Sequence, residues 1–275
     1  KEHNTRLREM ARDRGLTLNE WAYTPLEGGE EILCATEEAL YTQLGLAWIP
    51  PELREDRGEF ELAAANALPR LIEASDIRSD LHMHTVWSDG ALSAREMAWI
   101  ARERGLRYIV ITDHSQSLGV ANGLSPERLL AQREEIRALD AEMGPDFRVF
   151  QGVEMEIRAD GNLDYPDEVL ASLDVVIASL HTGLRQPREQ VTARLLNAIR
   201  SPHVDIIGHP RGQMIPDREP ADLDMDAVFA AARQTDTALE INASPYRLDL
   251  DDAHARQAAA QGIKIAIDTD SHGAK

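Results

Sequence analysis

The stretch SDLHMHTVWSDG, residues 79–90, brings together side chains that can bind a metal ion. His82 and His84 are two positions apart, so on a β-strand both side chains point to the same side. Asp89 follows them in a polar turn. Two imidazoles and a carboxylate are suitable ligands for zinc or a similar ion. A pair of hydrogen-bonded histidines in a loop would give the same pattern, and this stretch alone does not decide between the two interpretations.

Similar side chains stand at the carboxyl ends of other apolar runs. YIVITDH, FRVFQGVE, DVVIASLH, VDIIGHP and IKIAIDTDSH carry, at or near their ends, His114, Glu154, His181, His209, Asp270 and His272. A single histidine at such a position is more often a structural hydrogen-bonding group. Here six of the nine histidines would gather with three carboxylates, and without a metal their desolvation and repulsion would be uncompensated. The coincidence favours a site for several metal ions.

The elements that must position these side chains follow an alternating pattern. Short apolar runs predict strands at 79–84, 107–113, 147–155, 174–181, 204–209, 237–243 and 263–270. Helical spacing predicts helices at 93–105, 124–140, 187–201 and 249–262, with Ser93 and Ser125 as N-caps. Seven strands with intervening helices favour a closed α/β barrel, in which the carboxyl ends of all strands meet at one opening. The scattered candidate ligands would then converge.

The composition limits the class of protein. The chain has 275 residues, 43% of them hydrophobic, without an apolar run long enough to span a membrane and without a signal-peptide pattern. The single cysteine, Cys34, excludes an internal disulfide and fits a reducing cytoplasm, where we expect the protein to be located. A net charge of −19 argues against a nucleic-acid partner, unless bound metal ions reverse the local charge.

Residues 1–77 form a separate region. KEHNTRLREMARDRG predicts an amphipathic helix that breaks at Gly15, and LTLNEWAY continues as a β-like segment. Thr36 is a suitable cap for a second helix, and the pair Pro50–Pro51 would stop that helix. This region therefore reads as a small α+β segment.

The motifs HMH, SDG, TDH, GVE, SLH, GHP and DSH together resemble the PHP (polymerase and histidinol phosphatase) phosphoesterase family. The resemblance implies a distorted seven-stranded (β/α)7 barrel with up to three metal ions at its opening. It assigns His82, His84 and Asp270 to the first ion, with Glu154 as a bridge to the second. By the same resemblance His181 and His209 complete the second ion, and the third is held by Asp89, His114 and His272.

The first region is similar to the thumb of bacterial family X DNA polymerases, on the segments KEHN and IPPELRE. We therefore expect a thumb-like segment at 1–64, a linker at 65–77 and a PHP domain at 78–275. The resemblance places Asn4 and Arg8 toward the nascent base pair. The carboxylates for nucleotidyl transfer would precede Lys1, so this chain alone is expected not to polymerise DNA. The sequence is expected to be a fragment at both ends, lacking the polymerase core and the last part of the barrel.

The resemblance implies metal-dependent phosphodiester hydrolysis, most directly the 3′–5′ exonucleolytic processing of DNA ends in DNA repair. Glu154, Asp270 and His181 would be the catalytic residues. Two to three divalent ions, manganese or zinc, suit the mixture of histidine and carboxylate ligands. Position alone makes Arg211 and Arg247, or Arg185, candidates to clamp a phosphate.

Three other functions stay open. A metal-dependent amidohydrolase also places two histidines on its first strand, but many of these enzymes need a lysine in mid-barrel, and the barrel lysines, Lys264 and Lys275, come late. A histidinol-phosphate phosphatase would share the ligands, although it would not need residues 1–77. A mainly structural PHP module would use the metals for folding alone.

Overall fold

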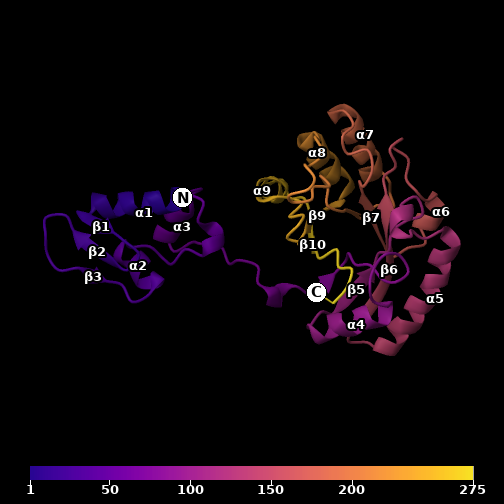
Figure 1. Ribbon diagram of the computed structural model, residues 1–275, viewed down its shortest axis with the longest axis horizontal. Coiled ribbons are helices and arrows are strands. Elements are labelled where there is room, and N and C mark those ends of the chain that lie inside the picture. The colour runs from indigo at the N-terminus through magenta and orange to yellow at the C-terminus, as the bar shows by residue number, and fades with distance from the viewer. Residues whose placement is uncertain (275) are drawn as a thin grey trace. The chain divides into compact units, whose positions relative to one another are not determined.

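The computed structural model describes residues 1–274, which divide into two compact units at Glu73 and Ala74. Figure 1 shows both units along the chain. Each unit has a hydrophobic core of its own. The core of the first unit gathers around Tyr23, Tyr41 and Phe60, and the larger second unit has two clusters. None of the described helices is long and apolar enough to cross a membrane.

The first unit packs helices on a small antiparallel sheet of order β1-β2-β3. In chain order its elements are α1 (Glu2–Asp13), β1 (Leu16–Leu18), β2 (Ala22–Pro25), β3 (Ile32–Leu33), α2 (Glu37–Gln43), the 3-10 helix η1 (Pro51–Leu53) and α3 (Glu59–Ala64). His3 lies in the core of this unit, where its ring nitrogens contact Glu59 Oε1 at 2.7 Å and the Tyr41 hydroxyl at 2.8 Å. This histidine is structural.

In this unit the predicted helix break at Gly15 and the predicted helix cap at Thr36 are confirmed, whereas the predicted end of the second helix is wrong. Gly15 has a left-handed backbone (φ 73°) just after α1, and the Thr36 side chain caps α2 by accepting from Ala39 N. The second helix ends at Gln43, however, well before Pro50–Pro51. Gly45 adopts φ 67° there and donates to a carbonyl of the last turn, which ends the helix without a proline. The proline pair instead opens η1.

The second unit is built on a seven-stranded parallel sheet of order β10-β9-β8-β7-β6-β5-β4. Its strands are β4 (Ser79–Asp80), β5 (Tyr108–Ile111), β6 (Arg148–Glu156), β7 (Val175–Ser179), β8 (Ile206–Ile207), β9 (Ala238–Asn242) and β10 (Ile265–Asp268). All seven predicted strands are present. Most are shorter than predicted, because regular pairing stops before most of the candidate ligands; Glu154, which is paired within β6, is an exception.

The first and last strands nearly close the sheet into a barrel. Met83 and Ser271 form a single parallel bridge, and His84 N donates to Ser271 O at 2.8 Å. Below this bridge Leu81 N donates to Asp268 Oδ1 at 2.9 Å, so a side chain takes the place of a ladder bond. The predicted distorted (β/α)7 barrel is therefore confirmed, and the distortion lies at the seam beside the first two histidines.

Helices that alternate with the strands along the chain cover the outside of the barrel (Figure 1). They are α4 (Ala94–Glu103), α5 (Pro126–Met143), α6 (Asp167–Leu170), α7 (Arg188–Ile199), α8 (Met225–Thr235) and α9 (Asp252–Ala260), with short 3-10 turns η2 (Ala74–Asp76) and η3 (Gly119–Ala121). The predicted caps at Ser93 and Ser125 are both present, and Ser93 forms a capping box with Glu96. Helices α6 and α8 are additions to the sequence prediction; Asp224 caps α8 through Ala227 N.

Candidate metal centre

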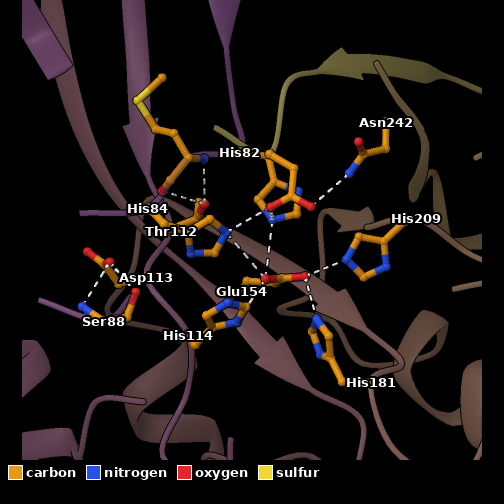
Figure 2. A network of polar contacts seen from close by, with 12 residues as sticks. His82, His84, Ser88, Thr112, Asp113, His114, Glu154, His181, His209 and Asn242 are labelled. Atoms are coloured by element: carbon orange, nitrogen blue, oxygen red, sulfur yellow. Dashed lines mark hydrogen bonds and ion pairs between the residues drawn. The ribbon is translucent and has the colours of Figure 1, made fainter. Parts of the chain in front are cut away.

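Glu154, near the end of β6, lies at the middle of a ring of imidazoles (Figure 2). Its side chain is 1% exposed. One carboxylate oxygen, Oε1, is 2.8 Å from His209 Nε2 and 3.1 Å from His181 Nε2. The other oxygen, Oε2, faces nitrogens at 2.9 to 3.5 Å that belong to His114, His82 and His84. Five histidines from the ends of four different strands thus share one carboxylate.

Two further carboxylates complete the cluster. Asp270 Oδ1 lies 3.1 Å from His84 Nε2 and 3.5 Å from His82 Nε2. Asp89 lies on the opposite side of His84, with Oδ1 3.3 Å from His272 Nε2 and Oδ2 3.6 Å from His114 Nε2. All nine side chains that the sequence singled out therefore lie in one place, although they span residues 82 to 272.

Eight of the nine side chains fall into overlapping groups whose donor atoms lie within 4.8 Å of one another. His84 is shared by two of these groups, and so are His114 and Glu154. His209 joins the cluster through its contact with Glu154. The groups are His84, Asp89, His114 and His272; His82, His84, Glu154 and Asp270; and His114, Glu154 and His181. How the ions would divide these ligands stays a prediction.

Several donor atoms of the cluster are buried and, although some lie close to a charged neighbour, they make no hydrogen bond. Buried polar atoms are normally satisfied, so each such atom needs an explanation. A bound cation would use these lone pairs and remove the cost of burying them. The donor set therefore fits a multinuclear centre for divalent ions. The atoms in question are His82 Nε2, His84 Nδ1, His114 Nδ1, Glu154 Oε2, His181 Nε2 and His209 Nδ1.

Burial and neighbouring charges shift the pKa values of the residues in the cluster. Burial opposes the charged form of His82, but Glu240, Glu154 and Asp270 outweigh burial and raise its pKa well above the usual value. Burial also opposes the charged form of Glu154, yet the surrounding imidazoles hold its pKa well below the usual range. His209 differs, because burial and the nearby Arg247 lower its pKa to about 3. Neutral imidazole is the form that binds a metal.

Two glutamates that the sequence analysis missed orient the imidazoles from behind. Glu240 Oε1 lies 2.6 Å from His82 Nδ1, and its second oxygen accepts from His209 N. Glu156 Oε2 lies 2.7 Å from His181 Nδ1. Such outer partners fix the orientation of a ligand histidine. A signal existed in the sequence: Glu240 interrupts an apolar strand, and Glu156 is two residues after Glu154, on the same side of β6.

Asp113, at the end of the second predicted strand, shapes the loop that carries Asp89. Its carboxylate accepts from Thr85 Oγ1 at 2.7 Å, from Ser88 Oγ at 2.5 Å and from Gln132 Nε2 at 2.5 Å. These contacts hold the segment between His84 and Asp89. Figure 2 shows Asp113 and Ser88 beside the histidine ring.

The predicted phosphate-binding arginines have different surroundings. Arg247 Nε donates to Asp270 Oδ2 at 3.1 Å, and its Nη1 is buried without a hydrogen-bond partner. Arg211 directs Nη1 to Asp251 Oδ2 at 2.7 Å. Arg185 is exposed at the rim of a cavity of about 480 Å³ that His181 also lines. Of these three arginines, Arg247 is the one whose side chain bonds to a residue of the cluster, Asp270.

Two proteins of known structure share the barrel fold of the second unit. The barrel has the fold of histidinol phosphate phosphatase from Lactococcus lactis, crystallised with zinc, L-histidinol and phosphate, at a TM-score of 0.56 and 22% identity over 72% of this chain and 87% of that one. The putative histidinol phosphatase of Listeria monocytogenes gives the same TM-score at 15% identity, over 71% of this chain and 96% of that one. At these identities the likeness concerns the fold.

Sequence comparison identifies the family. Residues 80–244 match the model of the PHP domain, and the chain belongs to the PHP domain family. Residues 1–55 match the model of the DNA polymerase beta thumb. Both resemblances drawn from the sequence motifs are therefore confirmed.

Two relatives with similar sequences have names that point to different activities. The chain is 47% identical over 272 residues to the DNA polymerase/3′-5′ exonuclease PolX of Bacillus subtilis, covering 99% of this chain and 47% of that protein. It thus spans about half the length of this relative. A probable phosphatase of Thermoanaerobacter is 34% identical over 205 residues, which cover 70% of this chain and 78% of that protein.

Proposed function

We propose that this chain hydrolyses phosphodiester bonds at DNA ends as a metal-dependent 3′–5′ exonuclease. The observation that carries the proposal is the convergence of six histidines with the carboxylates of Asp89, Glu154 and Asp270, where several buried donor atoms make no hydrogen bond. DNA is favoured as the substrate by the thumb segment at 1–55 and by the similarity to PolX over nearly the whole chain.

The proposed cofactors are two to three divalent ions, manganese or zinc. Mixed imidazole and carboxylate ligands suit both metals. His82, His84 and Asp270 would hold the first ion, with Glu154 between it and a second ion at His181 and His209. Asp89, His114 and His272 would hold the third. When bound, such ions lower the pKa of a coordinated water and neutralise phosphate charge.

The side chains of the cluster define a buried base and an open rim. His82, His84 and His209 have fully buried side chains, whereas Asp89 is 34% exposed and His272 is 39% exposed. We expect the substrate to approach from the rim. Of the three proposed catalytic residues, Glu154 and Asp270 would hold the centre together, and His181, at 13% exposure, would lie nearest to the incoming phosphate.

Arg247 is the proposed substrate contact of this chain. It lies against Asp270, and its buried, unpaired Nη1 is available to a phosphate oxygen. A guanidinium is well suited to this because it offers several fixed donors. Arg211 would reach a phosphate only by leaving its ion pair with Asp251, so it is the weaker of the two candidates.

The net charge of −19 does not oppose this assignment. Three divalent ions would outweigh the carboxylates of Asp89, Glu154 and Asp270, so the local field would attract a phosphodiester. We further propose that the upstream polymerase core is a partner of this chain, that the two act in DNA repair, and that the protein is cytoplasmic. The share of PolX that the chain spans supports the first of these.

A phosphomonoesterase is the second candidate, favoured by the probable phosphatase of Thermoanaerobacter, of which the chain covers 78%. The thumb segment gives such an enzyme no evident use. Substrate preference separates the two candidates: an exonuclease favours an oligonucleotide, and a monoesterase favours an aryl monophosphate or histidinol phosphate.

The test uses the purified chain with manganese, a 3′-labelled oligonucleotide, an aryl phosphodiester and an aryl monophosphate. We expect release of the 3′ label, its loss in chelator, and its loss in His84→Ala. His203→Ala is the matched control, because His203 lies outside the cluster. The proposal fails if neither diester is cleaved.

A further inference from the structure

Arg194, on α7, is a buried cation whose hydrogen-bond acceptors are neutral carbonyl and amide oxygens. Its relative exposure is 3%. Burying a guanidinium is costly, and burial lowers the pKa of Arg194, an effect that Glu156 partly offsets. Five hydrogen bonds compensate for the lost water. Nε donates to Arg158 O at 2.9 Å, Nη2 donates to Ile157 O at 2.6 Å and Thr182 O at 2.9 Å, and Nη1 donates to Gly183 O at 3.2 Å and Gln186 Oε1 at 2.6 Å.

These acceptors belong to two segments that are far apart in the sequence. Ile157 and Arg158 directly follow the end of β6, and Thr182 and Gly183 come just beyond β7. The planar guanidinium offers five N–H donors in a fixed arrangement, which a flexible ammonium does not reproduce. Arg194 thus ties the ends of two neighbouring strands together.

The two segments that Arg194 connects also carry Glu156 and His181, which contact each other. Glu156 Oε2 accepts from His181 Nδ1 at 2.7 Å and Oε1 accepts from Thr182 Oγ1 at 2.7 Å. Ile157 is the residue after Glu156, and Thr182 is the residue after His181. Arg194 therefore holds the backbone immediately beside both members of the pair that orients the His181 ring.

Gly183 gives independent evidence that the close approach is built into the sequence. It has a left-handed backbone (φ 63°), and a Cβ there would lie 2.7 Å from Arg194 Nη1. A Cβ at this position would therefore require the guanidinium to shift. Glycine permits both the left-handed backbone and the close approach of the guanidinium.

We propose that Arg194 is a positioning residue, which holds Glu156 and His181 so that the His181 imidazole is presented to a divalent metal ion. The inference rests on the proposed metal centre. Removal of an outer partner of a ligand histidine typically weakens metal binding about 10- to 100-fold. Arg194 acts one step further out, through the backbone, so we expect the lower part of that range.

The experiment measures manganese binding by calorimetry for the wild-type chain, Arg194→Lys, Gln186→Ala and the control Arg188→Met. Arg188 lies on the same helix, but its side chain is 49% exposed and pairs with Asp222. We expect about 10-fold weaker binding at one site in Arg194→Lys, with the other sites unchanged, and activity restored by excess manganese. Gln186→Ala, which removes one acceptor, should shift the same site by a smaller factor.

A merely structural role would lower the melting temperature and weaken all sites alike, without rescue by excess metal, and that result would overturn the inference. If Arg194→Lys fails to fold, Gln186→Ala decides alone: wild-type affinity in this variant contradicts the inference. Absence of manganese binding in the wild-type chain would instead overturn the proposed metal centre, and the inference with it.

Discussion

At the scale of single residues, Glu154 connects the parts of the cluster. Its two oxygens contact five histidines, and no other carboxylate of the described cluster contacts as many. The surrounding imidazoles keep the pKa of this buried carboxyl far below its usual range, so the group is ionised. A charge in this position can serve two ions at once, which is what a bridging ligand requires.

Replacing Glu154 with glutamine keeps the volume of the side chain and removes its charge. We expect bound metal to fall by at least one ion per chain and aryl phosphodiester turnover to fall at least about 100-fold. Elemental analysis and steady-state turnover measure both effects. Glu134→Gln, at a position 76% exposed on α5, is the control. Wild-type metal content in Glu154→Gln would contradict the bridging role.

At the scale of elements, the candidate ligands come from segments at or near the ends of the strands. β4 stops at Asp80, and the chain continues through His82 and His84 without a further ladder. Two features fix this segment: the bridge from Met83 to Ser271, and the turn that Asp113 holds. Strand ends are free to turn their side chains inward, and the barrel brings these ends together.

Gly90 is needed where this turn closes on itself. A Cβ at position 90 would lie 2.4 Å from His84 O and 2.7 Å from Thr85 N. Gly90→Ala should therefore displace the His84 backbone, cost about 1–3 kcal/mol of stability and weaken metal binding. Thermal melts and metal titration measure the two effects. Gly119→Ala, where a Cβ has open space, should change neither. Equal behaviour of the two variants would show that the turn tolerates the extra carbon.

An ion pair of the first unit gives a prediction on pH. Hydrogen bonds from Arg54 and Trp48 lower the pKa of Glu37 from 4.5 to about 2. The folded state therefore prefers the ionised form, and its stabilising contribution is complete above about pH 4.5 and is lost as the pH falls toward 2. Because the Glu37 side chain is 55% exposed, solvent screening keeps the effect small.

Urea unfolding of the first unit between pH 6 and pH 2.5 measures this contribution. Wild type should lose stability over that interval more steeply than Glu37→Gln, in which the titrating group is absent. Glu38→Gln, one position along the same helix, should follow the wild-type curve. Parallel curves for wild type and Glu37→Gln would exclude the ion pair as the cause.

At the scale of the whole molecule, the chain joins two units with separate hydrophobic cores. The nine candidate ligands lie in the second unit, between His82 and His272. Metal should therefore stabilise the second unit alone, by about 2.7 kcal/mol when its concentration is 100 times the dissociation constant. The domain limits at 64 and 78 stay predictions alongside the observed division at Glu73.

Calorimetry of the whole chain should show two unfolding transitions. Added manganese should raise the melting temperature of one of them, chelator should reverse the shift, and His84→Ala should abolish it. A single transition that moves as a whole with metal would mean that the two units unfold together.

The sequence by itself determined the residue types, their order and the local signals. Alternating apolar runs predicted seven strands, and Ser93, Ser125 and Thr36 marked helix starts, because caps and periodicity are local properties. The same locality explains the missed helix end at Gln43, where a left-handed glycine ended the helix before the more conspicuous prolines.

Only the tertiary structure decided which side chains contact one another. That Glu154 contacts five histidines, that Glu240 and Glu156 orient two of them, and that Arg211 is engaged by Asp251 depend on distances across the barrel. The same holds for Arg194, which looks like an ordinary helix residue in the sequence. Contacts between strand ends far apart in the chain arise from barrel closure, and a linear pattern of letters does not contain those distances.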